Sequence, residues 1–158
     1  MRKPIVVIMA ILGISNIFAE NNKYIITTTN ETGVVSYEIS SITTINDLNT
    51  LFGPFTGTNI GDGNSVWHEW KDVEGNKIFD AYFKNNKLAI VILRTQKYYY
   101  LGLSQKSTIE EALKVIPNPY NDQNAGKNYR LVFFNNPDLR IDYNSATRLI
   151  MSIFLFFQ

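Results

Sequence analysis

Residues 44–55 read TINDLNTLFGPF and residues 108–120 read TIEEALKVIPNPY, and the two stretches align with each other. Apolar residues occupy matching positions in both, and each stretch ends in a proline followed by an aromatic residue. Self-similarity of this kind indicates an internal duplication. We therefore expect two copies of one structural unit, over about residues 39–95 and 102–157.

Each of the two stretches predicts a short helix with a defined start and stop. Ser107 and Glu110 have the spacing of a capping box. Thr44 and Asp47 are a weaker version of the same signal. Apolar residues recur on one helical face in both stretches, and proline then ends each helix because it cannot supply the next amide.

Strands are expected after each predicted helix, because alternating apolar residues are bounded by turns rich in Asn, Gly and Asp. The expected strands are Val66–Lys71, Ile78–Phe83 and Leu88–Thr95 in the first unit and Tyr129–Phe134, Leu139–Tyr143 and Arg148–Phe157 in the second, with an N-terminal hairpin of Tyr24–Thr29 and Val34–Ile39. The glycines of residues 57–63 are interpreted as a flexible loop. The apolar end of the chain predicts a central strand. The expected fold is α+β, with one antiparallel sheet and the helices on one of its faces.

The N-terminus predicts export from the cell. Arg2 and Lys3 precede an apolar run, Ile5–Ile14, and Ala19 stands where a signal peptide would be cleaved. The run is too short to cross ~30 Å of hydrocarbon, which needs roughly 20 apolar residues. We therefore expect residues 1–19 to be a signal peptide, no integral membrane span, and a periplasmic or secreted protein.

Charge and cysteine content exclude several classes of function. Arg2 and Lys3 are two of the 15 basic residues, and none of the 14 acidic residues precedes residue 20, so the mature chain is nearly neutral. It lacks the basic excess typical of nucleic-acid-binding proteins. The chain contains no cysteine, which excludes disulfide bonds, thiolate metal sites and a cysteine nucleophile. Residues 20–158 are expected to form a single domain stabilised by its core alone.

The order of elements resembles the tandem repeat of the β-lactamase-inhibitory-protein-like fold. The resemblance rests on a short helix, a stop at Gly53-Pro54 or at residues 117–119, and three strands with turns of the Asn-Asn-Lys type. It covers about residues 39–157. Small outer-membrane assembly lipoproteins share one copy of this unit, but this chain lacks their lipid-bearing cysteine. The resemblance implies an open sheet face that binds another protein, and it implies no particular partner.

The sequence contains no complete catalytic set, and we expect a protein that is not an enzyme and has no cofactor or metal. Alternation places the only histidine, His68, on the helix-covered side of its strand with Val66 and Trp70. A hydrogen-bonded structural role is the first interpretation, and a triad or zinc role is the alternative. Asp80 and Asp142 occupy comparable strands, as a paired acid and base would, but the polar face of a half-exposed sheet also explains them.

The open face of the expected sheet combines aromatic, arginine and carboxylate side chains. Protein interfaces favour such residues, while an ordinary solvated surface is the alternative. The residues expected to bind the partner are Trp67, Glu69, Lys71, Asp80, Tyr82, Arg130, Arg140, Asp142 and Arg148. The leading hypothesis is an exported protein-binding module, either an inhibitor of an envelope enzyme or an immunity protein. An envelope-maintenance or outer-membrane assembly role comes second, and a hydrolase using His68 comes third.

Overall fold

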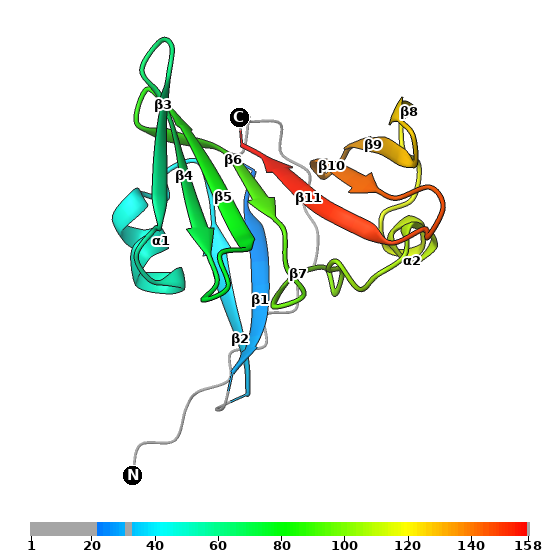
Figure 1. The fold of residues 1–158 in the computed structure, drawn as a ribbon, viewed down its shortest axis with the longest axis horizontal. Coiled ribbons are helices and arrows are strands. Elements are labelled where there is room, and N and C mark those ends of the chain that lie inside the picture. The colour runs from blue at the N-terminus through cyan, green and yellow to red at the C-terminus, as the bar shows by residue number, and fades with distance from the viewer. Residues whose placement is uncertain (1–21, 31–32, 158) are drawn as a thin grey trace, which may run out of the picture.

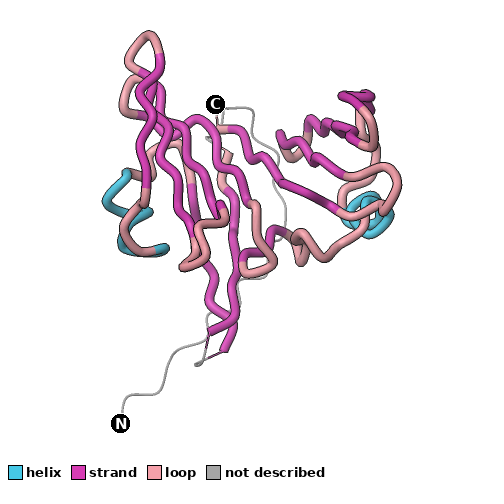
Figure 2. Tube along the Cα trace, viewed as in Figure 1, coloured by secondary structure: helices cyan, strands magenta, loops and turns pink. Residues whose placement is uncertain are grey.

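The computed structural model describes residues 22–30 and 33–157, and the predicted signal peptide lies outside these residues. Within them, strands dominate and the helices are short, as Figure 2 shows. The main sheet has eight antiparallel strands in the order β3-β4-β5-β6-β11-β10-β9-β8 (Figure 1). These strands are β3 (Gly57–Gly61), β4 (Ser65–Lys71), β5 (Lys77–Lys84), β6 (Lys87–Leu93), β8 (Asn121–Gly126), β9 (Tyr129–Asn135), β10 (Asp138–Tyr143) and β11 (Ile150–Phe156).

A second sheet of three strands packs against the main sheet. Its order is β2-β1-β7, and its strands are β1 (Tyr24–Asn30), β2 (Gly33–Ile39) and β7 (Tyr98–Tyr100). The Tyr24 hydroxyl lies 2.6 Å from the carbonyl oxygen of Asp138 and 2.8 Å from that of Phe156. This hydroxyl therefore fastens the N-terminal strand to the middle of the main sheet.

The two helices are α1 (Ile45–Phe52) and α2 (Ile109–Val115), and both begin with a capping box. In α1 the box is formed by Thr44 and Asp47, as predicted. In α2 it is formed by Thr108 and Glu111, one residue later than the predicted Ser107 and Glu110. Each box satisfies amides that the first helical turn leaves without an intrahelical partner.

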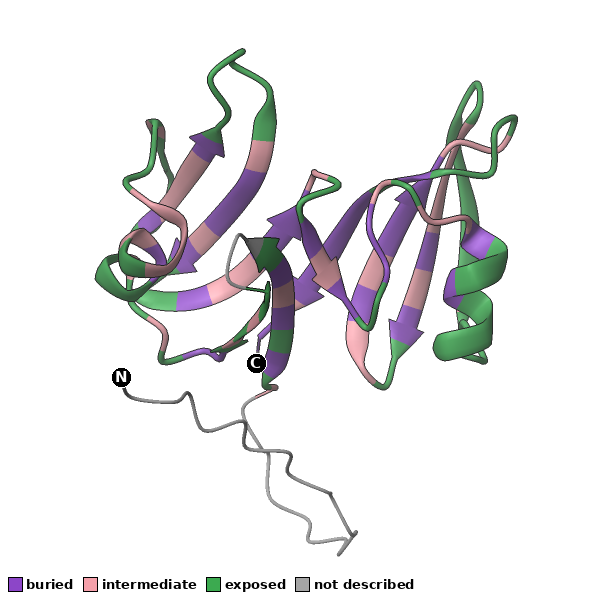
Figure 3. Ribbon diagram, turned by 90° about the horizontal axis from the view of Figure 1, so that it is seen from below, coloured by how far each residue is buried: buried purple, intermediate pink, exposed green. Residues whose placement is uncertain are grey.

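The core lies between the main sheet and the layer made by the two helices and the small sheet. Alternate residues of the strands between the two edges point into this layer, among them Trp70, Phe79 and Ala81, which are 2%, 0% and 0% exposed. The Phe52 ring of α1 stacks on Phe79, and the Tyr98 ring of β7 contacts both. Figure 3 shows the buried residues alternating along the strands while the outer sides of the helices stay exposed. We call this buried side of the main sheet the covered face.

The predicted α+β class is wrong, because the fold is mainly β and contains two sheets instead of one. The predicted unit of one helix and three strands is also wrong, because five strands follow α1, four of them in the main sheet, and four strands follow α2. The additional strands, β3 and β8, read GTNIG and NDQNAG, and they lack the apolar alternation that marks a strand in sequence. They are ordered by pairing with β4 and β9 at the two edges of the sheet. The predicted hairpin is present, but it pairs with β7 outside the main sheet.

The C-terminal strand lies where the sequence indicated. β11 pairs with β6 on one side and β10 on the other, so it is a central strand of the main sheet. It begins at Ile150, which leaves Arg148 in the preceding turn with a φ of 63°. This start is two residues later than predicted.

Candidate binding face

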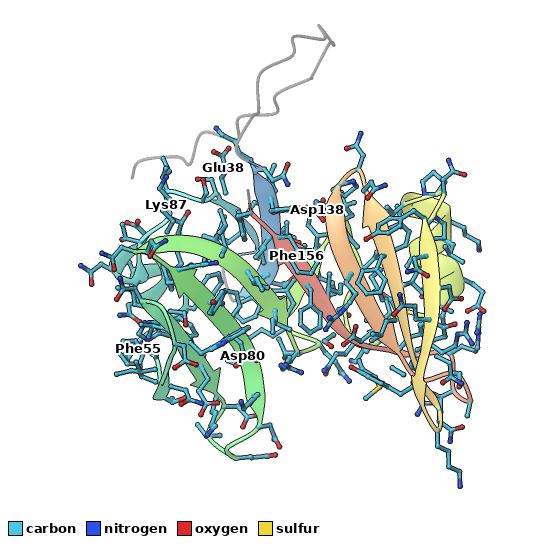
Figure 4. All side chains as sticks on the ribbon, turned by 90° about the horizontal axis from the view of Figure 1, so that it is seen from above. Glu38, Phe55, Asp80, Lys87, Asp138 and Phe156 are labelled. Carbon is cyan, nitrogen blue, oxygen red and sulfur yellow. The ribbon has the colours of Figure 1, made fainter. Side chains whose placement is uncertain are left out.

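The other side of the main sheet, which we call the open face, carries the side chains that alternate with the core. Because the helices and the small sheet pack on the covered face, the open face is the broad surface that they leave uncovered. Figure 4 labels Asp80 on the side of the strands away from β1. The strand register places on this face Trp67 opposite Tyr82, Glu69 opposite Asp80, Asp80 opposite Ile92, Ile92 opposite Phe154, Phe154 opposite Arg140, and Asp142 opposite Ser152.

Ring and guanidinium contacts fix the large side chains of the open face. The Trp67 and Tyr82 rings lie 4.6 Å apart between centroids, at 34° to each other. The Arg140 guanidinium carbon lies 3.6 Å from the centroid of the Phe154 ring, and the Arg94 guanidinium carbon lies 5.9 Å from it. Phe154 is thus in contact with two cations near the middle of the sheet, and such contacts are favourable when they are partly desolvated.

Asp142 is a buried carboxylate of the open face with a full set of donors. It is only 1% exposed. Arg140 donates from Nε to Oδ1 at 2.7 Å and from Nη2 to Oδ2 at 3.2 Å. Hydroxyl groups of Tyr129 and Ser152 also donate to Oδ2. The carboxylate therefore positions Arg140 over Phe154, and it is too buried to contact a partner itself.

Asp80 and Glu69 form a second charged cluster, in the half of the sheet that contains β4 and β5. Arg94 donates from Nε to Asp80 Oδ2 at 2.6 Å. Lys77 lies 2.6 Å from Glu69 and 4.0 Å from Asp80, and Lys71 lies 2.8 Å from Glu69. Hydrogen bonds from Lys71 and then Lys77 hold the pKa of the Glu69 carboxyl below its usual value.

A groove of about 520 Å³ opens beside this cluster. Its lining residues are Gly57, Thr58, Asn59, Trp67, Glu69, Lys77, Asp80, Ile92 and Arg94. The Glu69 side chain lies over Gly57, where an added Cβ would come within 2.6 Å of Glu69 Oε1. Glycine at this position therefore lets the edge strand β3 form one wall of the groove.

The structure separates the nine predicted partner-binding residues into two groups. The open face carries Trp67, Glu69, Lys71, Asp80, Tyr82, Arg140 and Asp142. Arg130 stands opposite buried Tyr143, on the covered face, and pairs with Asp122 at 2.9 Å. Arg148 lies in the turn before β11 and pairs with Glu110 of α2 at 2.6 Å. Both arginines are thus placed apart from the open face.

Sequence reasoning missed several residues of the open face. These are Asn59, Lys77, Ile92, Arg94 and Phe154. Asn59 lies in a segment interpreted as a loop. Ile92 and Phe154 belong to apolar strands, and the pairing of β6 with β11 that brings them together joins residues about 60 positions apart. Ile92 and Phe154 could have been identified only from the register between the two halves of the sheet.

His68 lies on the covered face opposite Ala81, where alternation placed it. Its Nδ1 atom is 3.1 Å from the Thr58 hydroxyl, and its ring is 4.6 Å from that of Phe55. Burial lowers the pKa of His68 below its ordinary value. Within residues 22–30 and 33–157, no group of three or more His, Cys, Asp or Glu side chains is arranged to hold a metal ion. Neither helix of this part of the chain has the length and hydropathy of a membrane span.

Tyr129 gives a prediction about alkaline stability. Burial first, and then its hydrogen bond to Asp142, raise the pKa of Tyr129 from 10.0 to about 12. Because the folded pKa exceeds the unfolded one, the neutral phenol stabilises the fold fully below pH 10, and this contribution is lost as the pH rises towards 12. We expect Tyr129→Phe to remove one late-ionising phenol from an ultraviolet titration. An unchanged high-pH phase in the variant would assign that phase to other tyrosines.

Comparisons with known proteins place the fold and leave the family open. No family model and no curated protein sequence matches the chain. The chain is similar to the crystal structure of an extracellular protein containing an SCP domain from Bacillus anthracis str. Ames, with a TM-score of 0.54 and 9% sequence identity. The match covers 76% of this chain and 47% of that chain, so this chain spans about half the length of that protein. At this identity, the likeness shows a shared fold alone.

Proposed function

We propose that this chain is an exported, non-enzymatic module that grips a partner protein with its open face. The observation that carries the proposal is the chemistry of that face, where the Trp67–Tyr82 ring pair and the Arg140 guanidinium, which lies over the buried Phe154 ring, are held in place by their contacts. Protein interfaces are enriched in aromatic residues and arginine, because these bury a large area and supply directional hydrogen bonds. Side chains that are already fixed lose less conformational entropy when a partner binds.

Two observations support export of the protein. Residues 1–19 have the basic start, apolar run and terminal Ala19 of a signal peptide. The Bacillus anthracis protein of similar fold is described as extracellular, which agrees with an exported location. Within this proposal the chain acts as an inhibitor of an envelope enzyme or as an immunity protein that neutralises a toxin. Both roles require tight binding and no turnover.

A double change, Trp67→Ala with Tyr82→Ala, tests the proposed face. The partner is first purified by affinity capture from envelope and culture fractions, with the full chain as bait, and its affinity is then measured by calorimetry. We expect the double variant to bind about 2 kcal/mol more weakly, because both rings leave the centre of the contact. Arg130→Ala is the matched control, because it alters a residue of the covered face, and it should bind normally. A partner held equally well by the double variant removes the open face from the interface.

A further inference from the structure

The two halves of the main sheet place one aspartate each at corresponding positions of the open face. The sheet order runs outward from β6 through β5 to β3, and from β11 through β10 to β8, so β5 corresponds to β10. Asp80 of β5 has Ile92 of β6 beside it, and Asp142 of β10 has Ser152 of β11 beside it. On the other side, Asp80 pairs with Glu69 of β4 and Asp142 pairs with Leu131 of β9. Trp67 and Tyr129 each lie two residues before these partners, so they occupy corresponding positions.

The donors around these two aspartates differ. Asp142 receives hydroxyl groups from both Tyr129 and Ser152 in addition to Arg140. Asp80 faces an indole and an isoleucine at those positions, and its only described hydrogen bond is that from Arg94 to Oδ2. Its Oδ1 atom has the Lys77 ammonium at 4.0 Å, beyond hydrogen-bond distance. The Asp80 side chain is nevertheless only 7% exposed. Because Oδ1 faces the groove and is not among the fully buried atoms, it is an acceptor that a ligand in the groove can reach.

Other polar groups in the same groove also have unused hydrogen-bonding capacity. Within residues 22–30 and 33–157, the Asn59 amide, the Trp67 indole N–H and the Nη1 and Nη2 atoms of Arg94 have no hydrogen-bond partner. The groove thus presents unused acceptors on Asp80 and Asn59, and unused donors on Asn59, Trp67 and Arg94. They surround a half-buried indole, and the groove volume of about 520 Å³ falls within the ~300–1,000 Å³ typical of ligand sites.

The charges of the groove cancel. Glu69 and Asp80 contribute two negative charges to its lining, and Lys77 and Arg94 contribute two positive charges. A charged ligand would therefore lie near a side chain of its own charge as well as one of opposite charge. A neutral ligand avoids this repulsion, and one that both donates and accepts hydrogen bonds can pair with the unused donors and acceptors of the groove. Hydroxyl groups do both. An indole beside them offers apolar area to a ring with C–H groups on its face.

We propose that this groove binds a neutral saccharide, whose ring packs on Trp67 and whose hydroxyl groups bond Asp80 Oδ1, Asn59 and Arg94. A sugar hydroxyl donates to Asp80, where Tyr129 and Ser152 donate to Asp142 in the other half of the sheet. This site lies within the open face and shares Trp67 with the proposed protein contact, but it does not rest on the binding of a protein.

Calorimetry with the purified full chain and three neutral probes tests the proposal: maltotetraose, cellotetraose and N-acetylchitotetraose. We expect saturable binding of at least one of them at concentrations up to about 10 mM. Binding should weaken at least tenfold in Trp67→Ala and about fivefold in Asn59→Ala. Asn59 is exposed and its side chain has no described hydrogen bond, while alanine keeps the backbone pairing of β3 with β4, so the change leaves the fold unchanged. Chitotetraose, the cationic counterpart of N-acetylchitotetraose, should bind no tighter than the neutral probes.

Phe133→Ala is the matched control, because Phe133 lies on the open face in the other half, outside the groove. It should bind the sugar as the unchanged chain does. The proposal is overturned if none of the three probes binds, or if Trp67→Ala and Asn59→Ala bind the sugar normally. Because these measurements contain no protein partner, their failure leaves the protein-binding proposal untouched. Retained sugar binding by a chain that captures no protein would contradict the protein-binding proposal alone.

Discussion

Trp70→Ala should lower the free energy of unfolding by about 4 kcal/mol, within the range of 3–5 kcal/mol for removing a buried tryptophan. Trp70 is 2% exposed and its ring meets that of Phe79 edge to face at 5.1 Å. Its indole N–H donates to the carbonyl oxygen of Gly53 at 2.8 Å, at the end of α1. The substitution therefore leaves a cavity in the core and an unpaired carbonyl group where the helix ends. Urea unfolding followed by circular dichroism measures the loss.

The matched control for this change is Trp67→Ala, three residues earlier on the same strand. Alternation turns Trp67 to the open face, where it is half-exposed and contacts Tyr82. Its removal should cost about 1–2 kcal/mol, because a partly exposed ring leaves no closed cavity and the pair with Tyr82 contributes about 0.5–1.5 kcal/mol beyond area burial. We therefore expect Trp70→Ala to lower mainly the free energy of unfolding and Trp67→Ala to weaken mainly binding. Equal losses of stability from both changes would contradict the assignment of Trp70 to the covered face and Trp67 to the open face.

The sequence predicted those strands whose residues alternate, and it missed those that depend on a neighbour. β5 carries Phe79, Ala81 and Phe83 at every second position, and β4 carries Val66 and Trp70 with His68 between them, so the extent and faces of both strands could be read from the sequence. β3 and β8 consist largely of Gly, Asn, Thr and Asp, which are mostly disfavoured in strands, and pairing at the sheet edge overrides that preference. β7 has three residues and depends on β1, about 70 positions away. The fold class was misjudged for these reasons.

Residues of the candidate site were predicted correctly on those strands whose alternation was assigned to the right faces. The residues placed on β4 and β5 lie on the open face, as alternation required. Arg130 lies two and four residues before buried Val132 and Phe134, so alternation places it on the covered face although its side chain is charged. Arg148 was assigned to a strand that in fact begins two residues later. The contact of Arg94 with Phe154 depends on how β6 meets β11, which no local pattern contains.

The open face relies on buried ion pairs to hold its arginines. Asp80 and Asp142 are 5% and 1% exposed, so each carboxylate depends on its arginine for compensation of charge. In turn, each arginine is fixed near Phe154 by its carboxylate. Breaking one such pair should therefore have a structural effect larger than that of any exposed ion pair of this protein.

Arg140→Ala should lower the free energy of unfolding by about 3–5 kcal/mol, because it leaves the carboxylate of Asp142 buried without a cation. The remaining donors, Tyr129 and Ser152, are neutral hydroxyl groups that solvate the charge only in part. The change also removes the guanidinium that lies 3.6 Å from the Phe154 ring. Chemical denaturation at neutral pH, where the carboxylate is ionised in the unfolded chain, measures the effect.

The double variant Arg140→Ala with Asp142→Asn separates the cost of the buried charge from that of the lost packing. The asparagine is neutral and still accepts a hydrogen bond from Tyr129, so we expect the double variant to regain about 2 kcal/mol over Arg140→Ala. Lys71→Ala is the surface comparison, since its ion pair with Glu69 is exposed and should contribute less than about 1 kcal/mol. If the double variant is no more stable than Arg140→Ala, the loss comes from packing on Phe154, and Asp142 tolerates its burial through the hydroxyl groups alone.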